Sequence, residues 1–405
     1  MVEYFIIFAL AFIVAFSATP IAKKLALKAG ALDVPSDERR MHRHPIARFG
    51  GLAIVSGFLV SILFNVIGAF IGVSGTYMPD LQLIGLIAGI VVIEIAGVID
   101  DIWQVKARIK LAFQVAAAII VVLSGTKIEI LTNPFSSTHI ATLNLYISYI
   151  ITVIWIVGIT NAVNLIDGLD GLAAGVASIA SLSLFFVSVI YSRWDMAIIT
   201  AALAGGALGF LPYNFNPAKI FMGETGSAFL GFTLAVVAVQ GTLKAYAAIA
   251  IAAPILILGL PLFDTIFAIG RRIAKGKSIM EADRGHLHHR LIDMGLSQKQ
   301  SVAIMYAVSA VLGLCAIVLA DKGALSAIIL IIILSAFVVG GARYMSEINS
   351  NGSSDHESKN GKDGETPSKN DSKIDTLTVE GSKDQTKDTV AKADVNIKDV
   401  KEAKN

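Results

Sequence analysis

The sequence predicts an all-α polytopic membrane protein. Hydrophobic residues make up 55% of the 405 residues and the mean hydropathy is +0.70, well above the values of a soluble domain. Apolar stretches recur along the first 345 residues, and most approach the roughly 20 residues that a helix needs to cross a bilayer. The net charge of +2 says nothing about partners, and we expect no nucleic-acid partner.

Eleven stretches qualify as membrane-spanning helices, and the fourth and eighth are the shortest. In chain order they cover residues 4–22, 51–73, 82–100, 109–124, 145–163, 171–191, 195–212, 226–241, 246–269, 301–320 and 323–343. Glu3 precedes the first stretch, while Lys23 and Lys24 follow it, an order that argues against a cleaved signal peptide. The single cysteine, Cys315, lies within an apolar stretch and reads as a small core residue.

Lysine and arginine are distributed unevenly between the connecting loops. The loops after odd-numbered helices carry 18 of these residues, and the loops after even-numbered helices carry 4. Because basic residues concentrate in cytoplasmic loops, the odd-helix loops are expected in the cytoplasm. The protein is therefore predicted to cross the plasma membrane many times, with its N-terminus outside and its C-terminus in the cytoplasm.

The composition changes after about residue 346. Residues 346–405 are rich in Lys, Asp, Ser, Asn and Gly and contain almost no aromatic residues, which predicts a disordered cytoplasmic tail. A regulatory role of this tail is open, although a passive solvated tail is the simpler interpretation. Residues 1–345 then form one membrane domain that carries all the motifs below.

An acidic pair, Asp100 and Asp101, ends the third predicted helix. Adjacent carboxylates repel each other unless a cation lies near, so one could bind Mg²⁺ while the other acts as a base. A solvated helix end is the alternative, but acidic groups at a helix C-terminus oppose the macrodipole. On the next helix Lys110 and Gln114 share a face, and Lys110 either meets a phosphate or extends to the membrane surface.

A second polar motif surrounds the cytoplasmic end of the fifth predicted helix. Asn161, Asn164, Asp167 and Asp170 recur every three residues, which keeps them near one stripe if the segment is helical. Oxygen ligands of this kind suit Mg²⁺ or a ribose and base edge. A plain turn would explain the two Asp-Gly pairs but not the two asparagines.

The third motif, Phe221-Met-Gly-Glu-Thr-Gly-Ser227, precedes the eighth predicted helix. Its glycines permit close backbone approach, and a helix N-terminus offers amide donors to an anion. Glu224 is a candidate metal ligand. Phe221 could stack on a base, although packing is the more ordinary role for a phenylalanine beside a membrane.

Basic side chains complete the predicted cytoplasmic face. His286, His288 and His289 form a His-Leu-His-His segment in the loop after the ninth helix. Because no cysteine lies nearby, phosphate binding is more plausible for them than a zinc site. Arg43 and Arg48 in the first cytoplasmic loop could also hold phosphates, with attraction to anionic lipid as the alternative.

Together these motifs resemble the polyprenyl-phosphate N-acetylhexosamine-1-phosphate transferases over about residues 1–343. The shared signals are Arg48-Phe-Gly-Gly51, Gly97-Val-Ile-Asp-Asp101, Lys110 with Gln114, Asn161 to Gly171, Asn216 to Ser227 and His286-Leu-His-His289. The form of the histidine motif and the eleven helices resemble the branch that transfers GlcNAc-1-phosphate. The phospho-MurNAc-pentapeptide translocase branch usually has ten helices.

The resemblance implies that UDP-GlcNAc and undecaprenyl phosphate react to give GlcNAc-pyrophosphoryl-undecaprenol and UMP. This step starts the synthesis of teichoic acid or another envelope polysaccharide. The resemblance also implies Mg²⁺ as cofactor, with Mn²⁺ as a substitute, and a homodimer embedded in membrane lipid. Asp100 would deprotonate the lipid phosphate and Asp101 would assist at the metal or phosphate.

The resemblance also assigns the remaining site residues. Glu224, Asp101 and Asp167 are the candidate metal ligands, and Glu224 counts with the aspartate pair as catalytic. The expected substrate-binding residues are Arg43, Arg48, Lys110, Asn161, Asn164, Asp167, Asp170, Phe221, His286, His288 and His289. One position departs from the family, which usually has aspartate where this chain has Glu224. Glutamate keeps the charge but adds a methylene, and Mg²⁺ demands near-ideal octahedral geometry.

Three alternatives remain open. A pentapeptide translocase would use a larger muramyl donor. A transporter would carry intramembrane carboxylates, although here they lie at one face rather than at the midplane. A scaffold protein would depend on its tail and tolerate loss of the aspartate pair.

Overall fold

The computed structural model is almost entirely helical. It describes residues 2–35, 44–72, 79–132, 140–242, 247–276 and 285–332. The chain divides into two compact units, 1–340 and 341–405, and the described residues all belong to the first. Arg43, the predicted tail and the second half of the last predicted span lie outside the described residues.

Twelve labelled helices, a further helical stretch over residues 324–332 and two short antiparallel hairpins make up the described part of the chain. The helices are α1 (Val2–Ala29), α2 (Gly50–Phe70), α3 (Leu81–Trp103), α4 (Ala107–Leu123), α5 (Leu145–Leu165), α6 (Leu172–Ile190), α7 (Trp194–Asn214), α8 (Gly223–Thr242), α9 (Ala247–Ile257), α10 (Gly259–Ala274), α11 (Leu287–Asp293) and α12 (Gln298–Lys322). The hairpins pair β1 (Leu32–Asp33) with β2 (Ile46–Ala47) and β3 (Ile130–Thr132) with β4 (Ile140–Thr142). The predicted helical class is confirmed, with these four short strands added.

Seven of the described helices are long and apolar enough to cross a membrane, namely α1, α2, α3, α5, α6, α7 and α12. The protein is therefore a multi-pass membrane protein, but the predicted count of eleven spans is not confirmed. The predicted span 246–269 is two helices, which meet at Leu258. Pro261 accounts for the break: it has no amide to donate to the carbonyl four residues earlier, at the end of α9, and it occupies the first turn of α10, where helices accept proline.

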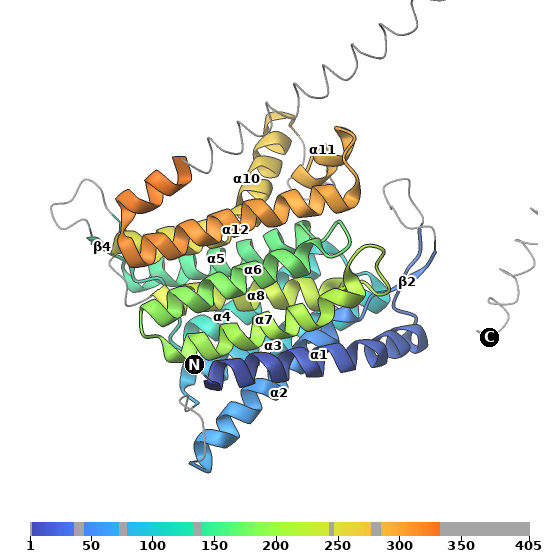
Figure 1. Ribbon diagram of the computed structural model, residues 1–405, viewed down its shortest axis with the longest axis horizontal. Coiled ribbons are helices and arrows are strands. Elements are labelled where there is room, and N and C mark those ends of the chain that lie inside the picture. The colour runs from blue at the N-terminus through green and yellow to red at the C-terminus, as the bar shows by residue number, and fades with distance from the viewer. Residues whose placement is uncertain are drawn as a thin grey trace, which may run out of the picture. The chain divides into compact units, whose positions relative to one another are not determined.

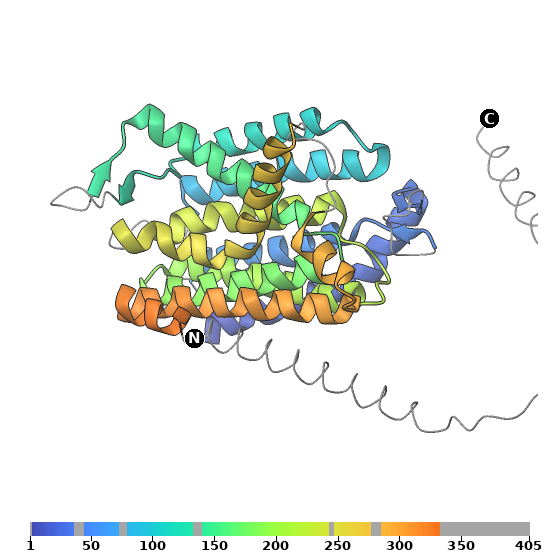
Figure 2. The ribbon, with the colours of Figure 1, turned by 90° about the horizontal axis from the view of Figure 1, so that it is seen from above.

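Helix α8 runs through the centre of the helical bundle (Figures 1 and 2). Its residues from Gly223 to Gly241 are buried on every side, which explains why it carries small and apolar residues all round instead of one apolar stripe. Small residues also allow α7 to lie against α1, because Gly205 and Gly209 meet the Phe8 and Phe12 carbonyls of α1.

The loops gather at two opposite ends of the bundle. The β1–β2 hairpin and α11 lie at one end, and the β3–β4 hairpin lies at the other (Figure 1). Figure 2 shows α10 crossing the other helices at a steep angle before the chain reaches α11. The end of the bundle with α11 contains the C-termini of α3 and α5 and the N-termini of α4 and α8, where the predicted polar motifs fall.

Candidate active site

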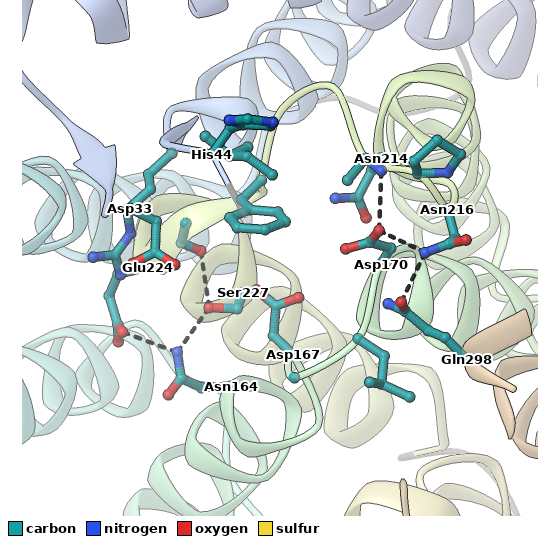
Figure 3. Close-up of a pocket in the computed structure, with 18 of the residues that line it drawn as sticks. Asp33, His44, Asn164, Asp167, Asp170, Asn214, Asn216, Glu224, Ser227 and Gln298 are labelled. Atoms are coloured by element: carbon teal, nitrogen blue, oxygen red, sulfur yellow. Dashed lines mark hydrogen bonds between the residues drawn. The ribbon is translucent and has the colours of Figure 1, made fainter. Parts of the chain in front are cut away.

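A cavity of about 720 Å³ opens at this end of the bundle. Its wall contains seven of the predicted site residues: Arg48, Lys110, Asn164, Asp167, Asp170, Phe221 and Glu224. Segments from five separate parts of the chain meet here, and Figure 3 shows Asp167 between a cluster around Glu224 and a cluster around Asp170. Asp100, Asp101, Asn161 and the three histidines lie behind this wall instead of lining the cavity.

Asp101, at the end of α3, holds the first turn of α8. Its Oδ1 accepts a hydrogen bond from the Glu224 amide at 2.8 Å, and its Oδ2 accepts from the Thr225 amide and hydroxyl at 3.2 and 2.9 Å. A carboxylate at a helix N-terminus satisfies amide groups that have no partner within the helix. Both oxygens of Asp101 are thus engaged by α8, and the residue fixes the position of Glu224.

The tight approach of these segments depends on Gly223. This residue has φ +74°, in the left-handed region that favours glycine, and a Cβ at this position would overlap the Arg48 carbonyl oxygen. The Arg48 guanidinium Nε lies 3.6 Å from Asp101 Oδ1. The segment between α1 and α2 is therefore tied to the same carboxylate that orders α8.

Lys110 connects the aspartate pair to Glu224. Its Nζ lies 3.4 Å from Asp100 Oδ2 and 2.9 Å from Glu224 Oε2. The second oxygen of Asp100 accepts a hydrogen bond from the Val105 amide at 3.0 Å, in the turn between α3 and α4. Asp100 is therefore the buried counter-ion that holds Lys110 against the cavity wall.

The two asparagines of α5 extend this network, as their spacing predicted. Asn164 Nδ2 donates to Glu224 Oε2 at 2.9 Å and to Ser227 Oγ at 2.8 Å. One turn earlier, Asn161 Nδ2 donates to Gln114 Oε1 at 2.6 Å. Glu224 thus receives hydrogen bonds from two helices, and both contacts use Oε2.

Asp167 differs from the other carboxylates because no residue in the described part of the chain donates a hydrogen bond to its side chain. Burial raises the pKa of Asp167 from the ordinary 3.8 to about 7. Arg48 opposes this rise, and the negative charges of Glu224, Asp101 and Asp170 add to it. A half-buried carboxylate that faces a cavity beside other acids is expected to hold a proton or a cation.

Replacing Asp167 by asparagine is expected to stabilise the protein when divalent cations are absent. The unfolded chain releases this proton near pH 3.8, whereas the folded protein holds it to about pH 7. The folded state therefore binds more protons within this window, and stability falls as the pH rises through it. Because asparagine removes this loss, the melting temperature in EDTA should rise by a few degrees at pH 8, and the gain should shrink towards pH 5. An equal gain at both pH values would contradict this account.

Asp170 organises the loop between α7 and α8. Its Oδ2 accepts hydrogen bonds from Asn216 Nδ2 at 2.9 Å and from the Ala218 amide at 3.0 Å. Asn216 Nδ2 also donates to Gln298 Oε1 at 2.7 Å, at the start of α12 (Figure 3). Asp170 therefore faces the cavity and also joins the α5–α6 loop to two other segments.

The histidine motif packs behind the α5–α6 loop. The His288 ring lies against Gly168, where an added Cβ would approach Nε2 to 2.5 Å. Burial, with the neighbouring charge of His289, lowers the pKa of His288 to about 4, so this ring is neutral at pH 7. His286 and His288 stack with ring centroids 5.8 Å apart. The three histidines thus support the loop that carries Asp167.

Sequence reasoning missed several polar residues in the cavity wall, namely Asp33, His44, Asn214, Asn216, Ser227 and Gln298. Asn214 accepts a hydrogen bond from the Gly171 amide at 3.1 Å and donates to the Ile220 carbonyl at 3.1 Å. Only Asn216 and Ser227 had a sequence signal, because they are the first and last residues of the shared segment that contains Glu224. The others come from segments that only the fold brings to the cavity.

Comparison with known proteins places the chain in a family. The profile of glycosyl transferase family 4 matches residues 83–242. The chain is 37% identical over 338 residues to the probable undecaprenyl-phosphate N-acetylglucosaminyl 1-phosphate transferase of Bacillus subtilis (strain 168), covering 84% of this chain and 91% of that protein. The chain belongs to glycosyl transferase family 4. The resemblance predicted from the motifs is confirmed.

Two further relatives match over slightly shorter stretches. The decaprenyl-phosphate N-acetylglucosaminephosphotransferase of Mycobacterium tuberculosis (strain CDC 1551 / Oshkosh) is 34% identical over 318 residues, with 73% of this chain and 77% of that protein covered. The undecaprenyl-phosphate alpha-N-acetylglucosaminyl 1-phosphate transferase of Salmonella typhi is 26% identical over 298 residues, with 72% and 77% covered. The profile match spans the segment from α3 to the end of α8, which contributes most of the cavity wall.

Proposed function

We propose that this protein transfers GlcNAc-1-phosphate from UDP-GlcNAc to undecaprenyl phosphate and releases UMP. The observation that carries the proposal is the cavity at the end of the helical bundle, where Lys110 and Arg48 lie beside Glu224 and Asp167. Two anionic substrates must meet in such a reaction, and basic side chains together with acidic cation ligands serve this purpose. The sugar and the lipid in this proposal are the ones that appear in the names of the relatives.

A divalent cation fits the residues present. Asp167 and Glu224 both face the cavity, and the Asp167 carboxylate has no hydrogen-bond donor among the described residues. Mg²⁺ is usually held by one or two carboxylates together with water and substrate phosphates, so this pair is sufficient. We propose that Asp167 and Glu224 hold Mg²⁺, or Mn²⁺ in its place, and that the cation stabilises negative charge on the transferred phosphate. Asp101 is the weaker candidate ligand because α8 engages both of its oxygens.

The surrounding residues then take complementary roles. Lys110 and Arg48 bind phosphate oxygens, and Asp100 keeps Lys110 in place. Phe221, Asp170 and Asn216 form the part of the wall that we assign to the nucleotide. Whether Asp100 also removes the proton of the lipid phosphate stays a prediction, and its two hydrogen bonds favour the counter-ion role.

We further propose that the cavity faces the cytoplasm of the cell, with the N-terminus outside. The loops at this end of the bundle follow odd-numbered predicted spans and carry most of the basic residues. In this orientation the acceptor phosphate lies at the membrane surface while its prenyl chain stays in the lipid. The product would enter the synthesis of teichoic acid or a related envelope polysaccharide.

Removing divalent cations is expected to abolish the reaction. The purified protein in detergent should release no UMP in excess EDTA, and added Mg²⁺ should restore release, with Mn²⁺ as a partial substitute. The measurement is UMP formation at a series of free cation concentrations. Undiminished release in EDTA would contradict the proposed metal site.

Donor competition distinguishes the proposed reaction from its nearest alternative. The protein is given undecaprenyl phosphate and equal amounts of UDP-GlcNAc and UDP-MurNAc-pentapeptide, and the lipid product is identified by mass spectrometry. We expect GlcNAc-pyrophosphoryl-undecaprenol. A muramyl-pentapeptide lipid would assign the protein to peptidoglycan synthesis instead.

A further inference from the structure

Asp264 lies outside every motif found in the sequence, yet it contacts the histidine motif directly. Its Oδ2 is 2.9 Å from His286 Nδ1, and its Oδ1 accepts a hydrogen bond from the Leu287 amide at 2.8 Å. Asp264 and His286 are only 8% and 5% exposed. A buried carboxylate with both oxygens directed at one short segment is a specific arrangement, because burying a charge is costly unless it is paired.

The chain is shaped to make this contact. Asp264 belongs to α10, and Gly285 immediately precedes the motif. Gly285 lies directly against the Arg271 guanidinium of α10, so the backbone passes close to this helix just before His286 reaches Asp264. Arg271 and Asp264 both belong to α10, and both contact this short segment.

The contact continues towards the cavity. The His286 ring stacks on His288 at an interplanar angle of 9°, and His288 lies against Gly168. Gly168 adjoins Asp167 and itself lines the cavity. A continuous line of contacts therefore runs from Asp264 through the two rings to the loop that carries the proposed cation ligand.

We propose that Asp264 is a positioning residue that acts through His286 on binding of the UDP-GlcNAc diphosphate. This inference rests on the proposed function. A carboxylate at Nδ1 fixes a hydrogen on that nitrogen and sets the ring orientation. The oriented ring holds the stacked His288 against Gly168 and so fixes the neighbouring loop at the cavity. Asparagine at position 264 would replace one of the two acceptor oxygens with an NH₂ group and weaken this order.

The test compares Asp264→Asn, His286→Ala and the double variant by steady-state kinetics. Asp264→Asn is expected to lower kcat/KM for UDP-GlcNAc roughly tenfold, mainly through KM. KM for undecaprenyl phosphate should stay within about twofold of wild type. In the His286→Ala background the Asp264→Asn change should have no further effect, because its route of action has already been removed.

Asp195→Asn is the matched control. Asp195 is also an aspartate paired with a base, since its oxygens lie 3.1 and 2.8 Å from Arg193 Nε and Nη2, but it begins α7, at the opposite end of that helix from the cavity-lining Asn214. It should leave KM for UDP-GlcNAc unchanged. Each rate is divided by the amount of folded protein, which is measured by thermal melting. Unfolding of a variant is then not mistaken for weaker substrate binding.

Two results would overturn the inference. One is an unchanged KM for UDP-GlcNAc in Asp264→Asn, and the other is a double variant whose loss equals the product of the two single losses. Failure of the proposed function is recognised separately, because wild-type protein would then release no UMP from UDP-GlcNAc.

Discussion

Replacing Glu224 by glutamine is expected to lower kcat for UMP release by roughly 10²–10³-fold. The glutamate is 7% exposed, faces the cavity and receives hydrogen bonds from Lys110 and Asn164 at 2.9 Å each. Glutamine has nearly the same shape but removes the negative charge, so a cation loses one of its two proposed ligands. Steady-state rates at saturating substrates and a series of Mg²⁺ concentrations measure the effect.

The companion variant Glu224→Asp distinguishes the effect of the negative charge from the effect of side-chain length. It keeps the carboxylate but withdraws it from Lys110 and Asn164, and it restores the residue that the family resemblance leads us to expect. We predict that it retains Mg²⁺-dependent activity well above that of Glu224→Gln. If both variants were equally inactive, the precise reach of Glu224 would matter more than its charge, and if both were fully active, the proposed metal site would be wrong.

Replacing Asp101 by asparagine is expected to destabilise the protein by about 3 kcal/mol and to remove most of the activity. Both carboxylate oxygens accept hydrogen bonds from the start of α8, so one of them would become an NH₂ group facing another donor. The first turn of α8 would shift, and Glu224 with it. Thermal melting and UMP release in the same preparation measure the two effects.

Asp80→Asn provides the control for this variant. Asp80 also caps a helix, since its Oδ1 accepts a hydrogen bond from the Leu83 amide at 2.8 Å, but it is exposed and begins α3, at the other end of that helix from Asp101. Asparagine is nearly as good an N-cap as aspartate, so stability and activity should hardly change. An equally small effect of Asp101→Asn would contradict its assigned role in ordering α8.

The sequence predicted which polar residues belong to the site, but it did not predict which of them contact each other. The three-residue spacing of Asn161 and Asn164 correctly indicated one face of a helix, because helical geometry is local. That Asn161 meets Gln114, and that Asn164 meets Glu224, depends on how α4, α5 and α8 pack. Side-chain pairing across helices is set by tertiary structure, and no local pattern encodes it.

The same distinction explains what was missed in the fold. Hydropathy located the apolar stretches, but it could not show that 246–269 breaks at Leu258, because prolines within a stretch hardly change its mean hydropathy. This break matters for the site, since α10 starts there and carries Asp264 to His286. Asp264 has no signal in the sequence because its partner lies 22 residues further along the chain.

The central claim is tested most directly by UMP release from purified protein given UDP-GlcNAc, undecaprenyl phosphate and Mg²⁺, with each component omitted in turn. The account predicts multiple turnovers only when all three are present, and almost none from Glu224→Gln under the same conditions. Turnover beyond one UMP per protein without the lipid, or no release from UDP-GlcNAc by folded wild-type protein, would contradict it.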